Sequence, residues 1–147
     1  EGRKLPQSQA ICRYLGNKAG LAGDDLWENA QIDVIADTLT DVRLPVAAFM
    51  WETNEEIKKA KKETYIKETL PFYMEKLDAV VKENGGYLAN KKLSWVDFLF
   101  ASISEFLSYA TDVPDATVNY PNLHALREKI FNLPQIKKWI SKRPNTP

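Results

Sequence analysis

The sequence has very little cysteine and histidine and carries no net charge. Among its 147 residues there is one cysteine, Cys12, and one histidine, His124. A single cysteine cannot form an internal disulfide, which agrees with a reducing compartment, and a single histidine excludes a three-histidine metal site. The 20 lysines and arginines balance 20 aspartates and glutamates. The chain therefore lacks the bulk positive charge that draws proteins to nucleic acids and anionic membranes.

Long hydrophobic runs are also absent. The longest run, residues 44–51, is far shorter than the roughly 20 residues that a bilayer-spanning helix needs. No apolar segment near the N-terminus resembles a signal peptide. The sequence contains neither a glycine-rich phosphate loop nor a nucleophile-elbow pattern. We therefore expect a cytoplasmic protein that binds neither nucleic acid nor membrane.

The sequence does have the apolar residues that a folded core requires, since 44% of its residues are hydrophobic and 11% are aromatic. Apolar residues three or four apart predict a helix over residues 26–51, with a kink or break at Pro45. A second such pattern covers residues 55–83, where Pro71 leaves open two helices or one bent helix. Lysine and glutamate interleave in its first half, which favours a solvated face over a nucleic-acid surface.

The clearest local signal is a capping box at Ser94 and Asp97. In such a box the serine accepts from the amide of the acidic residue, and the acidic side chain accepts from the serine amide. A helix is therefore predicted over residues 95–109. Two shorter helices, over residues 121–132 and 134–142, each begin with proline, whose missing amide hydrogen is not needed in a first turn. The body of the chain reads as an all-helical bundle.

The first residues differ from that bundle. Residues 2–6 read as a turn followed by a short extended piece. Residues 8–16 then read as a helix, and Ser8 is well placed to cap it.

Three carboxylates recur every four residues in the first long predicted helix. They are Asp33, Asp37 and Asp41, which this spacing places along one side of the helix. Such a stripe favours a nearby positive charge, from a partner chain, a cation or a ligand ammonium. Arg13 and Arg43 are candidate internal counterions. The alternative is an acidic face that is merely solvated.

Residues 4–16, which read Lys-Leu-Pro-Gln-Ser-Gln-Ala-Ile-Cys-Arg-Tyr-Leu-Gly, resemble the end of the thioredoxin-like domain of cytosolic glutathione transferases. The rest of the chain is similar to the sigma class, particularly its arthropod members. The motifs that carry this similarity fall in the family's order at residues 20–23, 27–33, 37–41, 68–73, 86–90, 93–98, 120–123 and 138–144.

This resemblance implies a fold and a division of the chain. Residues 24–147 are expected to be the family's all-helical C-terminal domain. Residues 1–20 are expected to be a remnant of the thioredoxin-like α/β domain, formed by its last strand and helix. Together these imply an all-α chain with a short α/β stub.

The resemblance also assigns site residues. Gln7 and Ser8 match the residues that bind the γ-glutamyl carboxylate of glutathione, and Asp41 matches the residue that reaches the glutathione of the opposite subunit in a homodimer. The residues that match the pocket for small hydrophobic electrophiles are Arg43, Ala47 and Met50. Glutathione is implied as co-substrate, without a covalently bound cofactor. Thr40 replaces a carboxylate of the family's cation-responsive branch, so no metal site is expected.

The chain departs from the family in what precedes residue 1. The family's tyrosine at the glutathione thiolate, its tryptophan and lysine at the glycyl end and its cis-proline loop have no match here, so no catalytic residue is expected in this chain. Because residue 1 is Glu, we expect a fragment of a sigma-like transferase that has little activity by itself. The complete form would conjugate glutathione to electrophiles or act on lipid peroxides.

A non-enzymatic protein is the alternative to a transferase. It would be a truncated, crystallin-like or adapter helical domain that acts by dimerisation. In either case, the apolar side of Leu5, Ile11 and Leu15 is expected to be exposed, because no sheet covers it.

Overall fold

The computed structural model describes residues 2–144. Within this range the regular structure is entirely helical, which confirms the predicted fold class. No helix in the described range is both long enough and apolar enough to cross a membrane. The helices are α1 (Ser8–Lys18), α2 (Leu26–Arg43), α3 (Ala47–Met50), α4 (Glu55–Thr64), α5 (Leu70–Glu83), α6 (Trp95–Thr111), α7 (Pro121–Phe131) and α8 (Pro134–Ile140).

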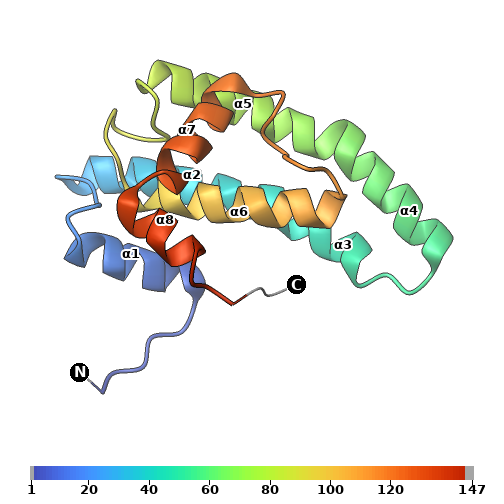
Figure 1. The fold of residues 1–147 in the computed structure, drawn as a ribbon, viewed down its shortest axis with the longest axis horizontal. Helices are drawn as coiled ribbons and strands as arrows, with labels where there is room; N and C mark the ends of the chain where they lie inside the picture. The colour runs from blue at the N-terminus through green and yellow to red at the C-terminus, as the bar shows by residue number, and fades with distance from the viewer. Residues whose placement is uncertain (1, 145–147) are drawn as a thin grey trace.

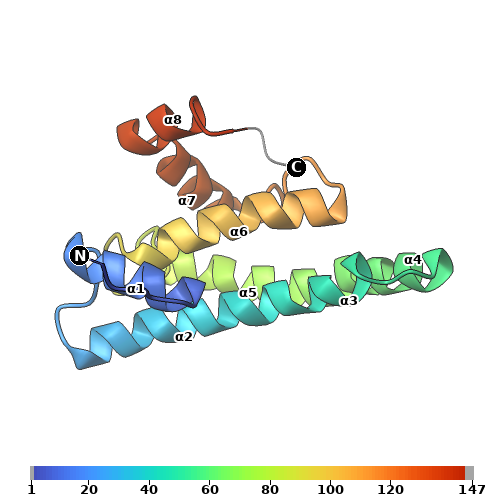
Figure 2. The same ribbon diagram turned by 90° about the horizontal axis from the view of Figure 1, so that it is seen from below.

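Helix α6 lies at the centre of the arrangement. It packs against α2 on one side and α7 on the other, while α7 also packs against α5 (Figures 1 and 2). α1 packs on α6 beside α2, and the chain continues from α7 into α8 at the opposite edge (Figure 2). The fold therefore places the start of α1 next to the long helices α2 and α6.

The core is continuous across these helices. It includes Ile32, Leu39 and Val42 of α2, Met74 and Leu77 of α5, Val96, Phe100 and Leu107 of α6, and Leu123, Leu126 and Ile130 of α7, all at most 2% exposed. Each such side chain contributes about 1.5–3 kcal/mol of burial free energy relative to exposure. The apolar stripes that predicted the helices are thus the faces that hold them together.

Both prolines inside the predicted helices interrupt them, in different ways. Pro45 lies in a 3-10 turn, Leu44–Val46, that separates α2 from α3. Pro71 is the second residue of α5, and a π-helical turn, Tyr65–Thr69, joins α4 to α5 before it. A proline ring clashes with the carbonyl four residues earlier, and the wider π turn accommodates it. Residues 55–83 thus stay helical throughout, as α4 and α5 joined by the π turn, rather than forming two separate helices (Figure 1).

Two expectations for the N-terminal residues are wrong. Ser8 does not cap α1, because the helix begins at Ser8 itself and Gln7 occupies the cap position with φ 75° and no side-chain hydrogen bond. The left-handed backbone at Gln7 shifts the boundary by one residue. The last strand of the stub is not formed either, since residues 2–6 have no regular secondary structure. A strand needs a neighbouring strand for its hydrogen bonds, and residues 2–144 offer none.

Candidate functional site

The start of α1 is held against α2 and α6 by specific contacts. Gln9 Nε2 donates to the carbonyl of Ala36 at 3.0 Å and also to Thr40 Oγ1. A Cβ at Gly16 would lie only 2.6 Å from Trp95 Cδ1, so glycine lets α1 approach α6 this closely. These contacts fix where the first residues of α1 stand.

The first turn of α1 presents backbone amides that no side chain caps. The carbonyl of Gln7 accepts from the amide of Ile11 at 3.0 Å, whereas no side chain accepts from the amides at the helix start. Gln7 and Ser8 are both exposed. Free N–H groups at a helix N-terminus favour an anion, because the helix dipole adds to their hydrogen-bonding capacity. Whether Gln7 and Ser8 bind the γ-glutamyl carboxylate stays a prediction.

The acidic stripe of α2 is neutralised at one end. Arg13 Nε lies 2.9 Å from Asp33 Oδ1, so the expected counterion is present. Asp37 and Asp41 are exposed, and in the described chain no ion pair is made by either. Arg43, the second candidate counterion, is not paired with the stripe within residues 2–144. Within the stripe, the carboxylates left without an ion pair are therefore those of Asp37 and Asp41.

A cleft of about 300 Å³ opens where α1, α2 and α6 meet. Two predicted site residues, Ser8 and Arg43, line the same cleft. Its other lining residues are Gln9 and Thr40, at the α1–α2 contact, and Leu99, Ser102, Ile103 and Phe106 of α6. The structure thus brings the expected glutathione-binding end of α1 and one expected electrophile-pocket residue to one concave surface.

The remaining predicted residues lie outside this lining. Gln7 and Asp41 are the chain neighbours of lining residues Ser8 and Thr40. Ala47 and Met50 belong to α3 and are exposed, with Met50 37% accessible. The α6 residues were missed by the sequence reasoning. The available signal was the spacing of Leu99, Ile103 and Phe106 at i, i+4 and i+7, which is that of an apolar stripe, although Ser102 beside them is polar and exposed.

Asp97 of the predicted capping box ties the start of α6 to the preceding loop. Its carboxylate accepts from the amides of Ser94 at 2.8 Å and Leu88 at 2.9 Å, as well as from the Ser94 hydroxyl. Asp97 is fully buried. Burial raises the pKa of its carboxyl, although the donated hydrogen bonds act in the opposite direction. These residues hold α6 in place and lie apart from the cleft.

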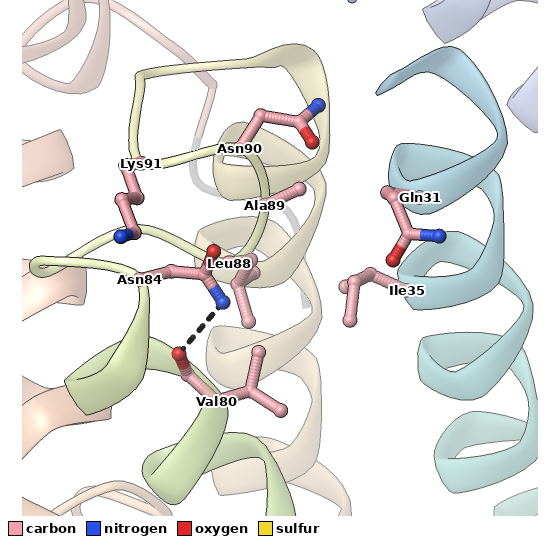
Figure 3. Close-up of a pocket in the computed structure, with 8 residues that line it drawn as sticks. All are labelled: Gln31, Ile35, Val80, Asn84, Leu88, Ala89, Asn90 and Lys91. Carbon is pink, nitrogen blue, oxygen red and sulfur yellow. Dashed lines mark hydrogen bonds between the residues drawn. The ribbon is translucent and has the colours of Figure 1, made fainter. Parts of the chain in front are cut away.

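A second hollow, of about 370 Å³, lies between α2, the end of α5 and the loop over residues 84–91 (Figure 3). Two of its three amide side chains, those of Asn84 and Asn90, donate to backbone carbonyls. Asn84 Nδ2 donates to Val80 at 3.1 Å, and Asn90 Nδ2 donates to the carbonyl of Glu28 at 2.9 Å. Because these groups already serve the chain's own backbone, the α1–α2–α6 cleft is the better candidate site.

Comparison with known proteins assigns the family. Residues 40–143 match the family "Glutathione S-transferase, C-terminal domain". The chain is 41% identical to a glutathione S-transferase of Anopheles gambiae, covering 99% of this chain and 71% of that protein. It is 40% identical to glutathione S-transferase S1 of Drosophila melanogaster, covering 99% of this chain and 58% of that protein.

A solved structure agrees with these relatives. The prostaglandin synthase D of Nilaparvata lugens superposes with a TM-score of 0.92 and 47% identity, over 100% of this chain and 72% of that one. The match over residues 40–143 and the Anopheles gambiae relative show that the chain belongs to the glutathione S-transferase family.

Proposed function

We propose that this chain is part of a sigma-like glutathione transferase that acts as a cytoplasmic detoxification enzyme. Glutathione is the co-substrate, and the complete protein conjugates its thiolate to small hydrophobic electrophiles or acts on lipid peroxides. The supporting relatives include glutathione S-transferases and prostaglandin D synthases. Each of these is longer than the segment that this chain covers, so the activity is proposed for a protein of that full length.

One observation carries the proposal: the uncapped start of α1 and the end of α2 border one cleft. A peptide carboxylate at the free amides beside Gln7 and Ser8 would place the body of glutathione next to that cleft. An electrophile in the cleft would then lie near the co-substrate, and positioning of this kind accounts for much of enzymatic rate enhancement.

Asp41 is the reason that the proposal includes a homodimer. Its carboxylate is exposed and has no ion-pair partner within residues 2–144. In a homodimer it would pair with the α-ammonium of the glutathione bound by the other subunit. A carboxylate without an ion pair contributes more binding free energy to such a contact than a carboxylate that an arginine already neutralises. Asp33 is of the second kind, because Arg13 pairs with it.

The test uses the 147-residue chain and the complete protein, obtained by sequencing the 5′ end of the transcript. Upstream sequence is expected to encode a tyrosine-containing βαβ segment. The complete protein should conjugate glutathione to 1-chloro-2,4-dinitrobenzene and bind a glutathione column, whereas the 147-residue chain should show negligible turnover and weak retention. Robust conjugation by the 147-residue chain would contradict the proposal that conjugation depends on an upstream segment.

Asp41→Asn in the complete protein should raise the KM for glutathione by about tenfold, because a charge-assisted contact is lost. Asp37→Asn, one turn earlier on the same helix, is the matched control and should leave that KM within about twofold. Equal effects of the two substitutions would count against a specific role for Asp41. A complete protein that forms dimers without any conjugation would favour the non-enzymatic alternative.

A further inference from the structure

A further hollow, here called the α5–loop hollow, lies between the start of α5 and the loop that joins α6 to α7. This loop returns past α5 to reach the start of α7 (Figure 1). The volume of about 490 Å³ is within the roughly 300–1,000 Å³ of small-molecule sites. The apolar part of its lining includes Ile66, Leu70 and Pro71 on one side and Val113, Pro114 and Val118 on the other. The hollow shares no lining residue with the α1–α2–α6 cleft.

Asp115 is the acidic residue of this lining, and its carboxylate already has partners. Its Oδ1 accepts from the amide and the hydroxyl of Thr117, both at 2.7 Å. Its Oδ2 lies 3.0 Å from His124 Nδ1 and 3.7 Å from Arg127 Nη1. Asp115 therefore holds the loop against α7 and is not left to bind a ligand.

Glu75 offers a second carboxylate at the end of the hollow next to α7. It lies on α5 one turn after Pro71, which lines the hollow, and one turn before Asp78, which accepts from the amides at the start of α7. Residues at this spacing share one face of a helix, so Glu75 faces the same side as both. It is exposed, and within residues 2–144 it makes no ion pair.

Tyr120 brings an aromatic ring to the same end of the hollow. It is half-buried, and its hydroxyl has no hydrogen-bond partner in the described part of the chain. Burial raises the pKa of this hydroxyl, and the negative charge of Glu75 raises it further, because the two side chains lie close to each other. A carboxylate beside an aromatic ring attracts a cation, since the ring face also carries negative potential.

The lysines nearest to this end in the sequence have other partners. Lys67 Nζ lies 3.7 Å from Glu63, and Lys76 Nζ lies 4.0 Å from the centroid of the Phe72 ring. Neither occupies the position beside Glu75 that a cation would take. The hollow thus combines an apolar wall with a carboxylate that the described residues do not neutralise.

We propose that the α5–loop hollow binds small apolar amines, with the ammonium group at Glu75 and Tyr120 and the apolar body against the wall that includes Val118. The ammonium donates to the Glu75 carboxylate and to the Tyr120 oxygen. A neutral molecule of the same shape gains only the apolar contacts, and an anion of that shape is repelled by Glu75. This site is additional to the cleft proposed for glutathione and its electrophile.

The test compares phenylbutylamine, phenylbutanol and phenylbutyrate on the 147-residue chain at pH 7. The three probes share one apolar body and differ in charge. Amide NMR spectra of the isotope-labelled chain report both the affinity and the place of binding. The amine should bind about fivefold more tightly than the alcohol, because only the amine carries a charge for Glu75. The acid should bind more weakly than the alcohol, and the shifted amides should lie within residues 66–71 and 113–120.

The variants locate the preference for the amine. Glu75→Gln should lower the affinity for the amine to that for the alcohol, whereas Glu75→Asp should retain part of the difference because it retains the charge. Val118→Asn, at a residue that is 66% exposed, should weaken the binding of amine and alcohol alike. Glu83→Gln removes an exposed carboxylate from the same helix outside the lining. It is the matched control and should change neither affinity. Thermal unfolding verifies that each variant is folded.

Three results would overturn the proposal: equal affinity for amine and alcohol, an amine preference that survives Glu75→Gln, or shifted amides only outside the two segments. Failure of all three probes to bind would overturn it as well. None of the probes is an electrophile and the assay needs no glutathione, so its outcome is separate from that of the conjugation test.

Discussion

At the scale of single residues, the fold shifts the carboxyl pKa values of two aspartates in opposite directions. Asp97 is fully buried, and burial raises the pKa of its carboxyl despite the amides that donate to it. Burial also opposes ionisation of Asp115, but the Thr117 hydroxyl and amide donate to it at 2.7 Å. Arg127 and His124 lie beside Asp115 as well, and the pKa of its carboxyl is lowered overall.

These shifts predict opposite pH dependences. Folded Asp97 holds its proton more tightly than the unfolded chain does, so its contribution to stability is full below about pH 4 and is lost as the pH rises through its folded pKa. The contribution of Asp115 is full above about pH 4 and is lost as the pH falls through its folded pKa. Carboxyl-carbon NMR titrations should therefore place Asp97 above and Asp115 below the ordinary aspartate value.

The variants Asp97→Asn and Asp115→Asn assign the two resonances. They also test the linkage, because the wild-type advantage in unfolding free energy over Asp97→Asn should shrink as the pH rises, and that over Asp115→Asn should grow. Finding both differences moving in the same direction would refute the assignment.

At the scale of helices, α7 begins on a cap that α5 supplies. Asp78 accepts from the amides of Asn122 at 2.8 Å and Leu123 at 2.9 Å, and from the Asn122 side chain at 2.7 Å. No side chain within α7 or at its own cap position does this. One half-buried carboxylate thus satisfies the helix start and joins two helices that pack against each other.

Asp78→Ala should lower the free energy of unfolding by about 1–2 kcal/mol, because it leaves helix-start amides without their acceptor. Chemical denaturation measures the loss, and hydrogen exchange should accelerate at residues 122–124 first. Asp78→Asn retains an acceptor oxygen and should cost less. Lys82→Ala, one turn later and exposed, is the control for a side chain removed from the same helix. Equal losses in Asp78→Ala and Lys82→Ala would argue against the cap.

Local periodicity was enough to predict most of the helices, because the residues that repeat every three or four positions are those that the fold buries. Ile32, Leu39 and Val42, for example, mark the inner face of α2 in the sequence and are at most 1% exposed in the structure. Both prolines were correctly read as interruptions. The π turn before Pro71 was not predicted, since it depends on how the chain relieves the clash with the ring.

What the sequence did not reveal depends on contacts between distant residues. Asp78 caps a helix 44 residues further on, and no local pattern records that pairing. The cleft wall at Leu99, Ile103 and Phe106 has the spacing of a core stripe, and only the position of α1 leaves it partly open. The family resemblance indicated Ser8 and Arg43 as separate site residues. That both line the same cleft became known only from the structure.

At the scale of the whole molecule, one apolar face lacks a cover within the described chain. Leu5, Ile11 and Leu15 are 46%, 38% and 55% exposed, which confirms the exposure predicted for them, and Tyr14 is 47% exposed. Together with Arg3, Lys4 and Lys18 they line a hollow of about 550 Å³ along α1 and the segment before it. α1 lies at the edge of the bundle (Figures 1 and 2), and the residues of the described chain that line the hollow all fall within residues 3–18. Contiguous apolar surface of this kind promotes association.

The 147-residue chain should therefore associate as its concentration rises, through the face formed by Leu5, Ile11, Tyr14 and Leu15. Sedimentation velocity should show a larger species that ammonium sulfate strengthens, because that salt favours apolar burial. Ile11→Glu with Leu15→Glu places two charges on the face and should keep the chain monomeric. Trp51→Glu, at an 83% exposed residue after α3, controls for the loss of any exposed apolar side chain. A wild-type monomer with strongly protected amides over residues 8–18 would show that this face needs no cover.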